Sequence, residues 1–199
     1  MRYSVLFIVG VALLPGVCMS TPGDAAMRAG HPEQAADLYR RGAEQGYADA
    51  AFKLGRLIEG GTLLDASYGG AGRWYVKACD LGYVVGCHNA GVGYEYGTLG
   101  LEKNYEEARS HYKRAAQQGY MQSQYNLGSL YSNQYFADNV EGLAWLLAAQ
   151  SKALKCMADP LCKWIIDDSP GHVARLKALM SADEIARSVA LSKTLAPSK

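Results

Sequence analysis

The stretch WYVKACDLGY, residues 74–83, decides the fold of this chain, and it continues into VVGCHNAGVGY, residues 84–94. The pattern predicts a helix that ends at a tight turn on Gly82, followed at once by a second helix, because a glycine after a periodic segment is a typical helix stop. A cysteine lies on each side of this turn, Cys79 before it and Cys87 after it. The stretch therefore predicts a helical hairpin.

The same unit recurs along most of the chain at a nearly constant spacing. The turn recurs as Gly46-Tyr47, Gly82-Tyr83 and Gly119-Tyr120, so the steps are 82−46 = 36 and 119−82 = 37 residues. A pair ending in glycine recurs at the same steps, as Leu54-Gly55, Ala90-Gly91 and Leu127-Gly128. An aromatic pair recurs as Leu38-Tyr39, Trp74-Tyr75 and His111-Tyr112, and in degraded form as Trp145-Leu146. A fixed period of this length predicts a solenoid of stacked repeats.

Within each unit the apolar residues follow a helical period. Ala108, Tyr112, Ala115 and Ala116 stand at i, i+4, i+7 and i+8, which is one stripe on a helix. Pro32 suits the first position of a helix. The pattern predicts helices over 32–45, 48–59, 68–81, 86–96, 104–118, 122–133 and 139–154, with loops at 60–67 and 97–103 and a leftover helix of an incomplete repeat within 21–30.

These markers together resemble the Sel-one-like repeat (SLR), a branch of the tetratricopeptide superfamily. The resemblance covers about residues 32–153. It implies an all-α fold, a right-handed solenoid of stacked helical hairpins, in a domain over 21–154. Two repeats depart from the pattern: Gly69-Gly70-Ala71-Gly72 predicts a late start for the helix there, and Gln134 stands in place of a loop glycine.

The last part of the chain leaves the repeat pattern. Residues 163–170, ending in Pro170, break the period, and two further helices are predicted to close the chain. The second of them opens with Ser181 and Glu184 in the spacing of a capping box. Because the end of a solenoid needs an atypical cap over its core, we expect residues 155–199 to form a disulfide-pinned helical cap with a short tail.

The N-terminus has the pattern of a secretory signal over residues 1–20. Arg2 precedes an apolar run of ten residues, 5–14, and small residues follow. The run is too short for a transmembrane helix, which needs about 20 apolar residues. Cys18 allows a lipoprotein interpretation, but Val17 stands where such lipoproteins carry glycine, alanine or serine, so we expect no lipid anchor. The signal predicts an exported protein, and together with the resemblance to exported SLR proteins it leads us to expect a periplasmic or secreted protein of a Gram-negative bacterium.

Four cysteines remain after such a signal, an even number that favours two disulfides in an exported chain. The turn at Gly82 brings Cys79 and Cys87 together, and Pro160 forces a turn between Cys156 and Cys162. Buried free thiols and a four-cysteine zinc site are the alternatives, although the spacings do not suit zinc. The first pair also resembles the staple of cysteine-rich secreted SLR proteins, which carry one in every repeat, whereas this chain has Ala43 and Ala51, then Ala116 and Gln124, at the equivalent positions.

The sequence offers little catalytic chemistry. Its four histidines, His31, His88, His111 and His172, are scattered, and His111 takes a structural position of the repeat. Residues 110–113 match the S-x-x-K motif of serine β-lactamases through Ser110 and Lys113, and some cysteine-rich SLR proteins are described as β-lactamases, but the S-D-N and K-T-G partners are missing from the sequence. We therefore expect no enzyme, cofactor or metal, and keep a β-lactamase-like enzyme as the alternative. A net charge of +1 with no basic block gives no indication of nucleic-acid binding.

A binding surface remains as the predicted function. In tetratricopeptide-like solenoids the first helix of each repeat lines the concave side. Side chains on those helices that the packing stripe leaves over mix aromatic, amide and charged groups, which suits protein recognition. They are Phe52, Lys53, Arg56 and Glu59; His88, Asn89, Val92 and Tyr96; and Tyr125, Asn126, Ser129 and Asn133. The interpretation is a monomeric, non-enzymatic solenoid that binds another protein, either as an immunity protein that neutralises a secreted toxin, for example a type VI secretion lipase, or as an adaptor for envelope or secretion machinery.

Overall fold

The computed structural model describes residues 22–62 and 69–195, and within these ranges it contains ten helices and no strand. The signal predicted over residues 1–20 lies outside the described residues. The helices are α1 (Pro22–Arg28), α2 (Pro32–Glu44), α3 (Ala48–Glu59), α4 (Ala71–Asp80), α5 (Val84–Tyr96), α6 (Tyr105–Gln117), α7 (Met121–Ser132), α8 (Asn139–Ala153), α9 (Pro160–Lys177) and α10 (Ala182–Leu195).

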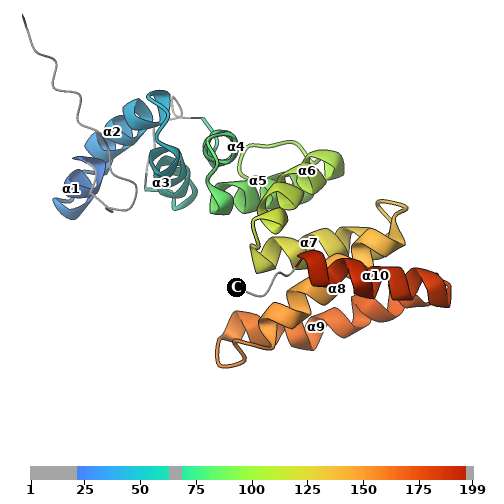
Figure 1. The fold of residues 1–199 in the computed structure, drawn as a ribbon. Helices are drawn as coiled ribbons and strands as arrows, with labels where there is room; N and C mark the ends of the chain where they lie inside the picture. The colour runs from blue at the N-terminus through green and yellow to red at the C-terminus, as the bar shows by residue number, and fades with distance from the viewer. Residues whose placement is uncertain (1–21, 63–68, 196–199) are drawn as a thin grey trace, which may run out of the picture.

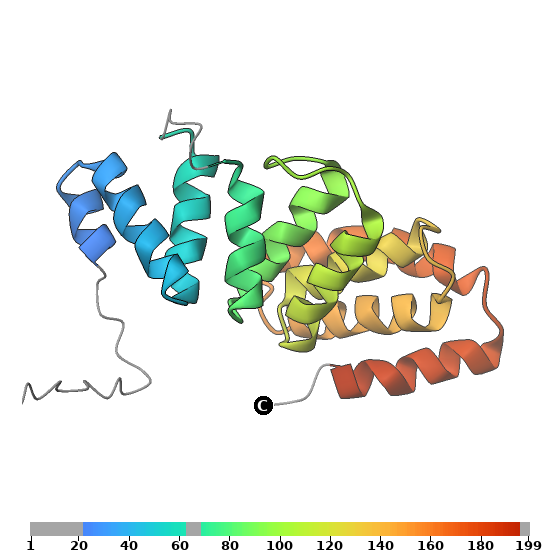
Figure 2. The same ribbon diagram turned by 90° about the horizontal axis from the view of Figure 1, so that it is seen from above.

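From α1 to α9 each helix packs against the next helix along the chain, and the stack follows an arc (Figures 1 and 2). The buried residues form five clusters along this arc, most of them shared by several neighbouring helices. Each hairpin therefore buries its apolar stripes against its neighbours, as a solenoid does. The predicted all-α solenoid of helical hairpins is confirmed.

The turns that join the hairpins have one geometry. Gly46, Gly82 and Gly119 adopt φ of 92°, 90° and 83°, in the left-handed region that favours glycine. At the middle turn the Tyr83 amide donates to the Ala78 carbonyl at 2.8 Å and the Gly82 amide to the Cys79 carbonyl at 2.8 Å. This pair of bonds is the Schellman motif, which satisfies the carbonyls at the end of a helix and fixes the angle at which the next helix begins.

The helices of the repeats begin and end within three residues of the predicted positions. The late start expected at Gly69-Gly70-Ala71-Gly72 is seen, because α4 begins at Ala71. The loop at 97–104 folds back onto this point, and the Gly72 amide donates to the Leu99 carbonyl at 2.8 Å. A Cβ on Gly70 would lie 2.5 Å from the same carbonyl oxygen, so the glycines make room for the loop of the next repeat.

The break from the repeat period over residues 163–170 is not a break in the helix. Helix α9 begins at Pro160, where Asp159 caps it by accepting from the Leu161 amide at 2.8 Å, and it continues through Pro170 to Lys177. The buried side chains of Ile165 and Leu176 pack into the cluster formed with α8. This apolar contact offsets the backbone hydrogen bond that a proline removes from a helix.

Helix α10 completes the cap in a way that the repeat pattern does not contain. It packs against α8 instead of pairing with α9, and its last residue, Leu195, accepts a hydrogen bond from the Gln124 amide group at 3.2 Å. The predicted capping box is confirmed, since the Ser181 amide donates to the Glu184 carboxylate at 2.8 Å and the Glu184 amide to the Ser181 hydroxyl at 3.3 Å. In the described part of the chain, no helix has the length and apolar character needed to cross a membrane.

Candidate functional site

The side of the solenoid formed by α1, α3, α5 and α7 is built on a repeated contact between a glycine and a tyrosine. Tyr75 on α4 packs against Gly55 on α3, and Tyr112 on α6 packs against Gly91 on α5. A Cβ would lie 2.8 Å from the first ring and 2.6 Å from the second. Tyr39 packs in the same way on Gly23 of α1, which shows that α1 is the remnant of a further repeat.

Each of these tyrosines donates its hydroxyl to a carboxylate on the preceding helix. Tyr39 donates to Asp24 at 2.8 Å, Tyr112 to Glu95 at 2.7 Å, and Tyr75 to Glu59. Burial first, and the neighbouring carboxylate second, raise the pKa of all three tyrosines well above the usual range. The hydroxyls therefore stay protonated at any physiological pH and act as donors.

The following helix of the stack adds a second partner to these hydroxyls. The side chain of Asn89 on α5 interacts with the Tyr75 hydroxyl, and that of Asn126 on α7 interacts with the Tyr112 hydroxyl. Lys53 takes the equivalent place on α3, where its ammonium lies 2.8 Å from Asp24 and 5.9 Å from the centre of the Tyr39 ring. A carboxylate, a tyrosine and a side chain of the next repeat thus form one rung, repeated three times along the stack.

A row of rings lies beside these rungs. The Phe52 ring lies 4.7 Å from Tyr83, and the His88 ring lies 5.0 Å from Tyr120 one repeat later. His88 also makes a hydrogen bond of 3.0 Å to Ser123, and burial lowers its pKa to about 4, so it is neutral at physiological pH. These rings join one repeat to the next.

In the last repeat the equivalent residues are covered by α9. Tyr125 donates its hydroxyl to Asp168 and packs against Trp164, with 4.8 Å between the ring centres. Ser129 lies 3.5 Å from His172. The cap therefore occupies the α7 end of this face.

The twelve residues predicted for the groove thus divide into three groups. Six bind or stack within the rungs and rings between repeats, namely Phe52, Lys53, Glu59, His88, Asn89 and Asn126. Two lie under α9, namely Tyr125 and Ser129. The remaining four are Arg56, Tyr96 and Asn133, which are exposed, and Val92, which is half-buried.

Several partners of these side chains were not predicted from the sequence. The carboxylates Asp24 and Glu95 are two of them, although Glu95 follows Glu59 by 95−59 = 36 residues, the period of the repeat. Asp168 and His172 carried no such signal, because α9 lies outside the repeat pattern.

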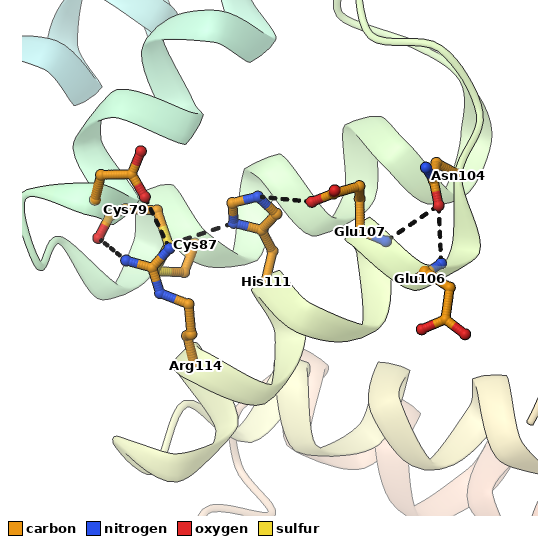
Figure 3. A network of polar contacts seen from close by, with 8 residues as sticks. Cys79, Cys87, Asn104, Glu106, Glu107, His111 and Arg114 are labelled. Atoms are coloured by element: carbon orange, nitrogen blue, oxygen red, sulfur yellow. Dashed lines mark hydrogen bonds and ion pairs between the residues drawn. A yellow bond between two sulfur atoms is a disulfide. The ribbon is translucent and has the colours of Figure 1, made fainter.

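Both predicted disulfides are present, with Cα–Cα distances of 4.4 Å for Cys79–Cys87 and 5.8 Å for Cys156–Cys162. The first is buried at the turn between α4 and α5, next to a polar network from α6 (Figure 3). His111 Nδ1 lies 3.4 Å from Cys79 Sγ, and Arg114 donates to the Cys79 carbonyl at 2.7 Å. Burial first, and Arg114 second, lower the pKa of His111, so its ring is neutral at physiological pH. The staple thus ties three consecutive helices together.

Two arrangements have the residue types of a catalytic site. Ser110 is exposed on α6, and the Lys113 ammonium lies 2.7 Å from the Glu141 carboxylate on α8. Ser132 lies 2.5 Å from His172 Nδ1, and His172 Nε2 lies 3.3 Å from Asp168. Only 3 % of the surface of Ser132 is exposed, and its hydroxyl donates to the Ser129 carbonyl of its own helix at 3.0 Å, so it offers almost no surface to a substrate.

A cleft of about 490 Å³ opens between α6 and α10, with α8 as its floor. Lys113 and Arg187 face it from opposite walls, and Asp138 and Glu141 balance their charges. Among the residues that the structure describes, no cluster of three or more histidine, cysteine or carboxylate side chains is arranged to hold a metal ion.

The geometry defines a class of protein, the helical-repeat solenoids whose hairpins are joined by glycine turns. A model of the Sel1 repeat family matches residues 30–47, 48–83, 84–120 and 122–149. This chain therefore belongs to the Sel1 repeat family, whose solenoids are typically scaffolds for protein interaction.

Solved structures share the fold. A protective antigen of uropathogenic Escherichia coli that displays an SLR fold is 23% identical, with a TM-score of 0.62. The alignment covers 87% of this chain and 38% of that one. A Sel1 repeat protein from Oxalobacter formigenes is also 23% identical, with a TM-score of 0.50 and coverage of 82% and 64%. This chain thus spans less than two thirds of either protein, and a comparison with curated proteins found no match.

Proposed function

We propose that this protein is a non-enzymatic solenoid that holds another protein on the face formed by α3 and α5. The observation that carries the proposal is Tyr96, which exposes 64% of its surface at the end of α5. An exposed tyrosine on a rigid element is an efficient contact for a partner, because it offers a large area at a small cost in conformational entropy.

The neighbouring contacts support this choice. The rungs satisfy the inner tyrosine hydroxyls, so the polar groups left for a partner are those that point out of the stack. Arg56 is exposed on α3, and Val92 is half-buried on α5, one turn before Tyr96. A mixture of aromatic, apolar and charged groups on a fixed frame is typical of protein interfaces.

We further propose that the protein works outside the cytoplasm, in the periplasm or after secretion. Two disulfides favour this location, because they persist in oxidising compartments. In that setting the partner is either a toxin, which the solenoid neutralises as an immunity protein, or a component of envelope or secretion machinery, which it links as an adaptor. The neighbouring genes distinguish these roles, since an adjacent toxin gene supports immunity and an adjacent export operon supports the adaptor.

The test is capture of partners from an envelope extract on the immobilised protein lacking residues 1–20. We expect a specific partner that is lost with Tyr96→Ala and with Arg56→Glu. The matched control is Tyr47→Ala, since Tyr47 is 49% exposed but lies at the turn before α3. If Tyr96→Ala and Arg56→Glu bind as the unaltered protein does, the interface lies elsewhere.

The absence of catalysis is part of the proposal. Lys113 is held by Glu141, so it is not poised to take a proton from Ser110. Incubation with a chromogenic cephalosporin should give no turnover. Turnover that disappears in Ser110→Ala would favour the β-lactamase-like alternative.

A further inference from the structure

Helix α9 covers the α7 end of the proposed binding face through a small set of polar contacts. The Tyr125 hydroxyl donates to Asp168, and the rings of Tyr125 and Trp164 meet edge to face with 4.8 Å between their centres. One turn along α9 from Asp168, His172 reaches Ser129 and Ser132 of α7. The contact is therefore centred on one titratable ring.

The partners of His172 define its protonation state. Its Nδ1 lies 2.9 Å from the Arg175 guanidinium, which is always charged and can only donate. Nδ1 must therefore carry a lone pair, and the ring hydrogen lies on Nε2, which is 3.3 Å from the Asp168 carboxylate. The ring is neutral when α9 is docked, and its side chain is 11% exposed.

A second proton on this ring would have to occupy Nδ1, directly against Arg175. The titratable and charged groups that face His172 are Asp168 and Arg175 on α9 and Tyr125 on α7. The Asp168 carboxylate favours a second proton on the ring, but its side chain is 46% exposed and it already accepts from Tyr125. Burial first, and Arg175 second, lower the pKa of His172.

We propose that the contact between α7 and α9 is an acid-sensitive latch, in which neutral His172 holds α9 over Tyr125 and Ser129 and protonation of Nδ1 loosens this contact. The inference rests on the proposed function, because the latch controls access to one end of the same face. Helix α9 stays attached to α8 when the latch opens, since Ile165 and Leu176 are buried there and the Cys156–Cys162 disulfide holds its start.

The test follows the indole N–H signal of Trp164 by NMR in the full chain between pH 7.5 and pH 5.0. We expect this signal to move with the His172 ring as the pH falls, while the signals of Trp74 and Trp145, which are buried in other contacts, stay in place. His172→Gln should abolish the transition. A Trp164 signal that stays fixed while His172 titrates, or three tryptophan signals that move together, would overturn the latch.

Two variants separate a latch from a merely structural histidine. Arg175→Gln removes the repulsion and should move the midpoint to higher pH, whereas Asp168→Asn removes the attraction and should move it to lower pH. Midpoints unchanged in both variants contradict the proposal. No partner takes part in this experiment, so its failure leaves the proposed binding face intact, and unchanged binding in Tyr96→Ala leaves the latch intact.

Discussion

At the scale of single residues, the stack depends on glycines that a neighbouring ring touches. Gly91→Ala would place a Cβ 2.6 Å from the Tyr112 ring, so the two helices must move apart or the ring must shift. We expect a loss of about 1–3 kcal/mol in the free energy of unfolding, measured with urea. Gly171→Ala is the control, because nothing lies within 4 Å of its added Cβ, and it should gain up to about 1 kcal/mol from helix propensity. Equal stability of the two variants would show that the close approach is not needed.

The tyrosine hydroxyl makes a separate contribution from its ring. Tyr112→Phe keeps the ring against Gly91 but removes the Tyr112 donor from the Glu95 carboxylate, whose pKa burial raises. Loss of one partner of a part-buried polar pair costs about 1–3 kcal/mol. Tyr47→Phe, at an exposed ring, should change the free energy of unfolding by less than about 0.5 kcal/mol. If both variants unfold at the same urea concentration, the rung does not stabilise the stack.

At the scale of elements, the staple between α4 and α5 acts on the turn. The double variant Cys79→Ala, Cys87→Ala carries alanine at both positions, as the first repeat does at the equivalent Ala43 and Ala51, so the packing should tolerate it. The unfolded chain gains the freedom of a short loop, and we expect a loss of roughly 2–3 kcal/mol, measured by urea unfolding without reductant. In the third repeat Gln124 bonds the Ala116 carbonyl at 3.2 Å across the same eight residues, which is a weaker, non-covalent substitute.

The control for the staple is chemical. When both are measured with reductant, the unaltered protein and the double alanine variant should unfold at the same midpoint, because both then lack the covalent closure of this turn and of Cys156–Cys162. A double variant as stable as the oxidised protein would mean that the turn at Gly82 is already fixed by its backbone hydrogen bonds.

The sequence predicted the repeat elements well because their signals are local. A glycine at a left-handed turn and an aromatic residue on a helical stripe depend on neighbours within about forty residues, and the period repeats them. The cap was less predictable, since Pro170 indicates a helix break and only the burial of Ile165 and Leu176 on α8 overrides it. For the candidate site, the pattern identified the helices of the face, but not that α9 covers Tyr125 and Ser129, because that contact is specific to the tertiary structure.

At the scale of the whole molecule, three half-buried or buried histidines make stability depend on pH. Burial lowers the pKa of His88 to about 4, and it also lowers the pKa of His111 and His172. Between about pH 6.5 and pH 4 the unfolded chain therefore binds more protons than the folded chain, so the free energy of unfolding falls as the pH falls through this window.

We expect His88 to dominate this dependence, with a contribution on the order of 3 kcal/mol between pH 7 and pH 4. Urea unfolding at constant ionic strength measures it. His88→Gln keeps a polar group for Ser123 but cannot be protonated, so its free energy of unfolding should fall less steeply with acid. The exposed His31 provides the control, because His31→Gln removes a histidine without removing a buried one. An equally steep fall in His88→Gln would place the acid sensitivity at His111 and His172, or at carboxylates such as Glu141. The pKa of Glu141 is lowered, because hydrogen bonds from Lys113, Tyr131 and Trp145 outweigh the effect of its burial.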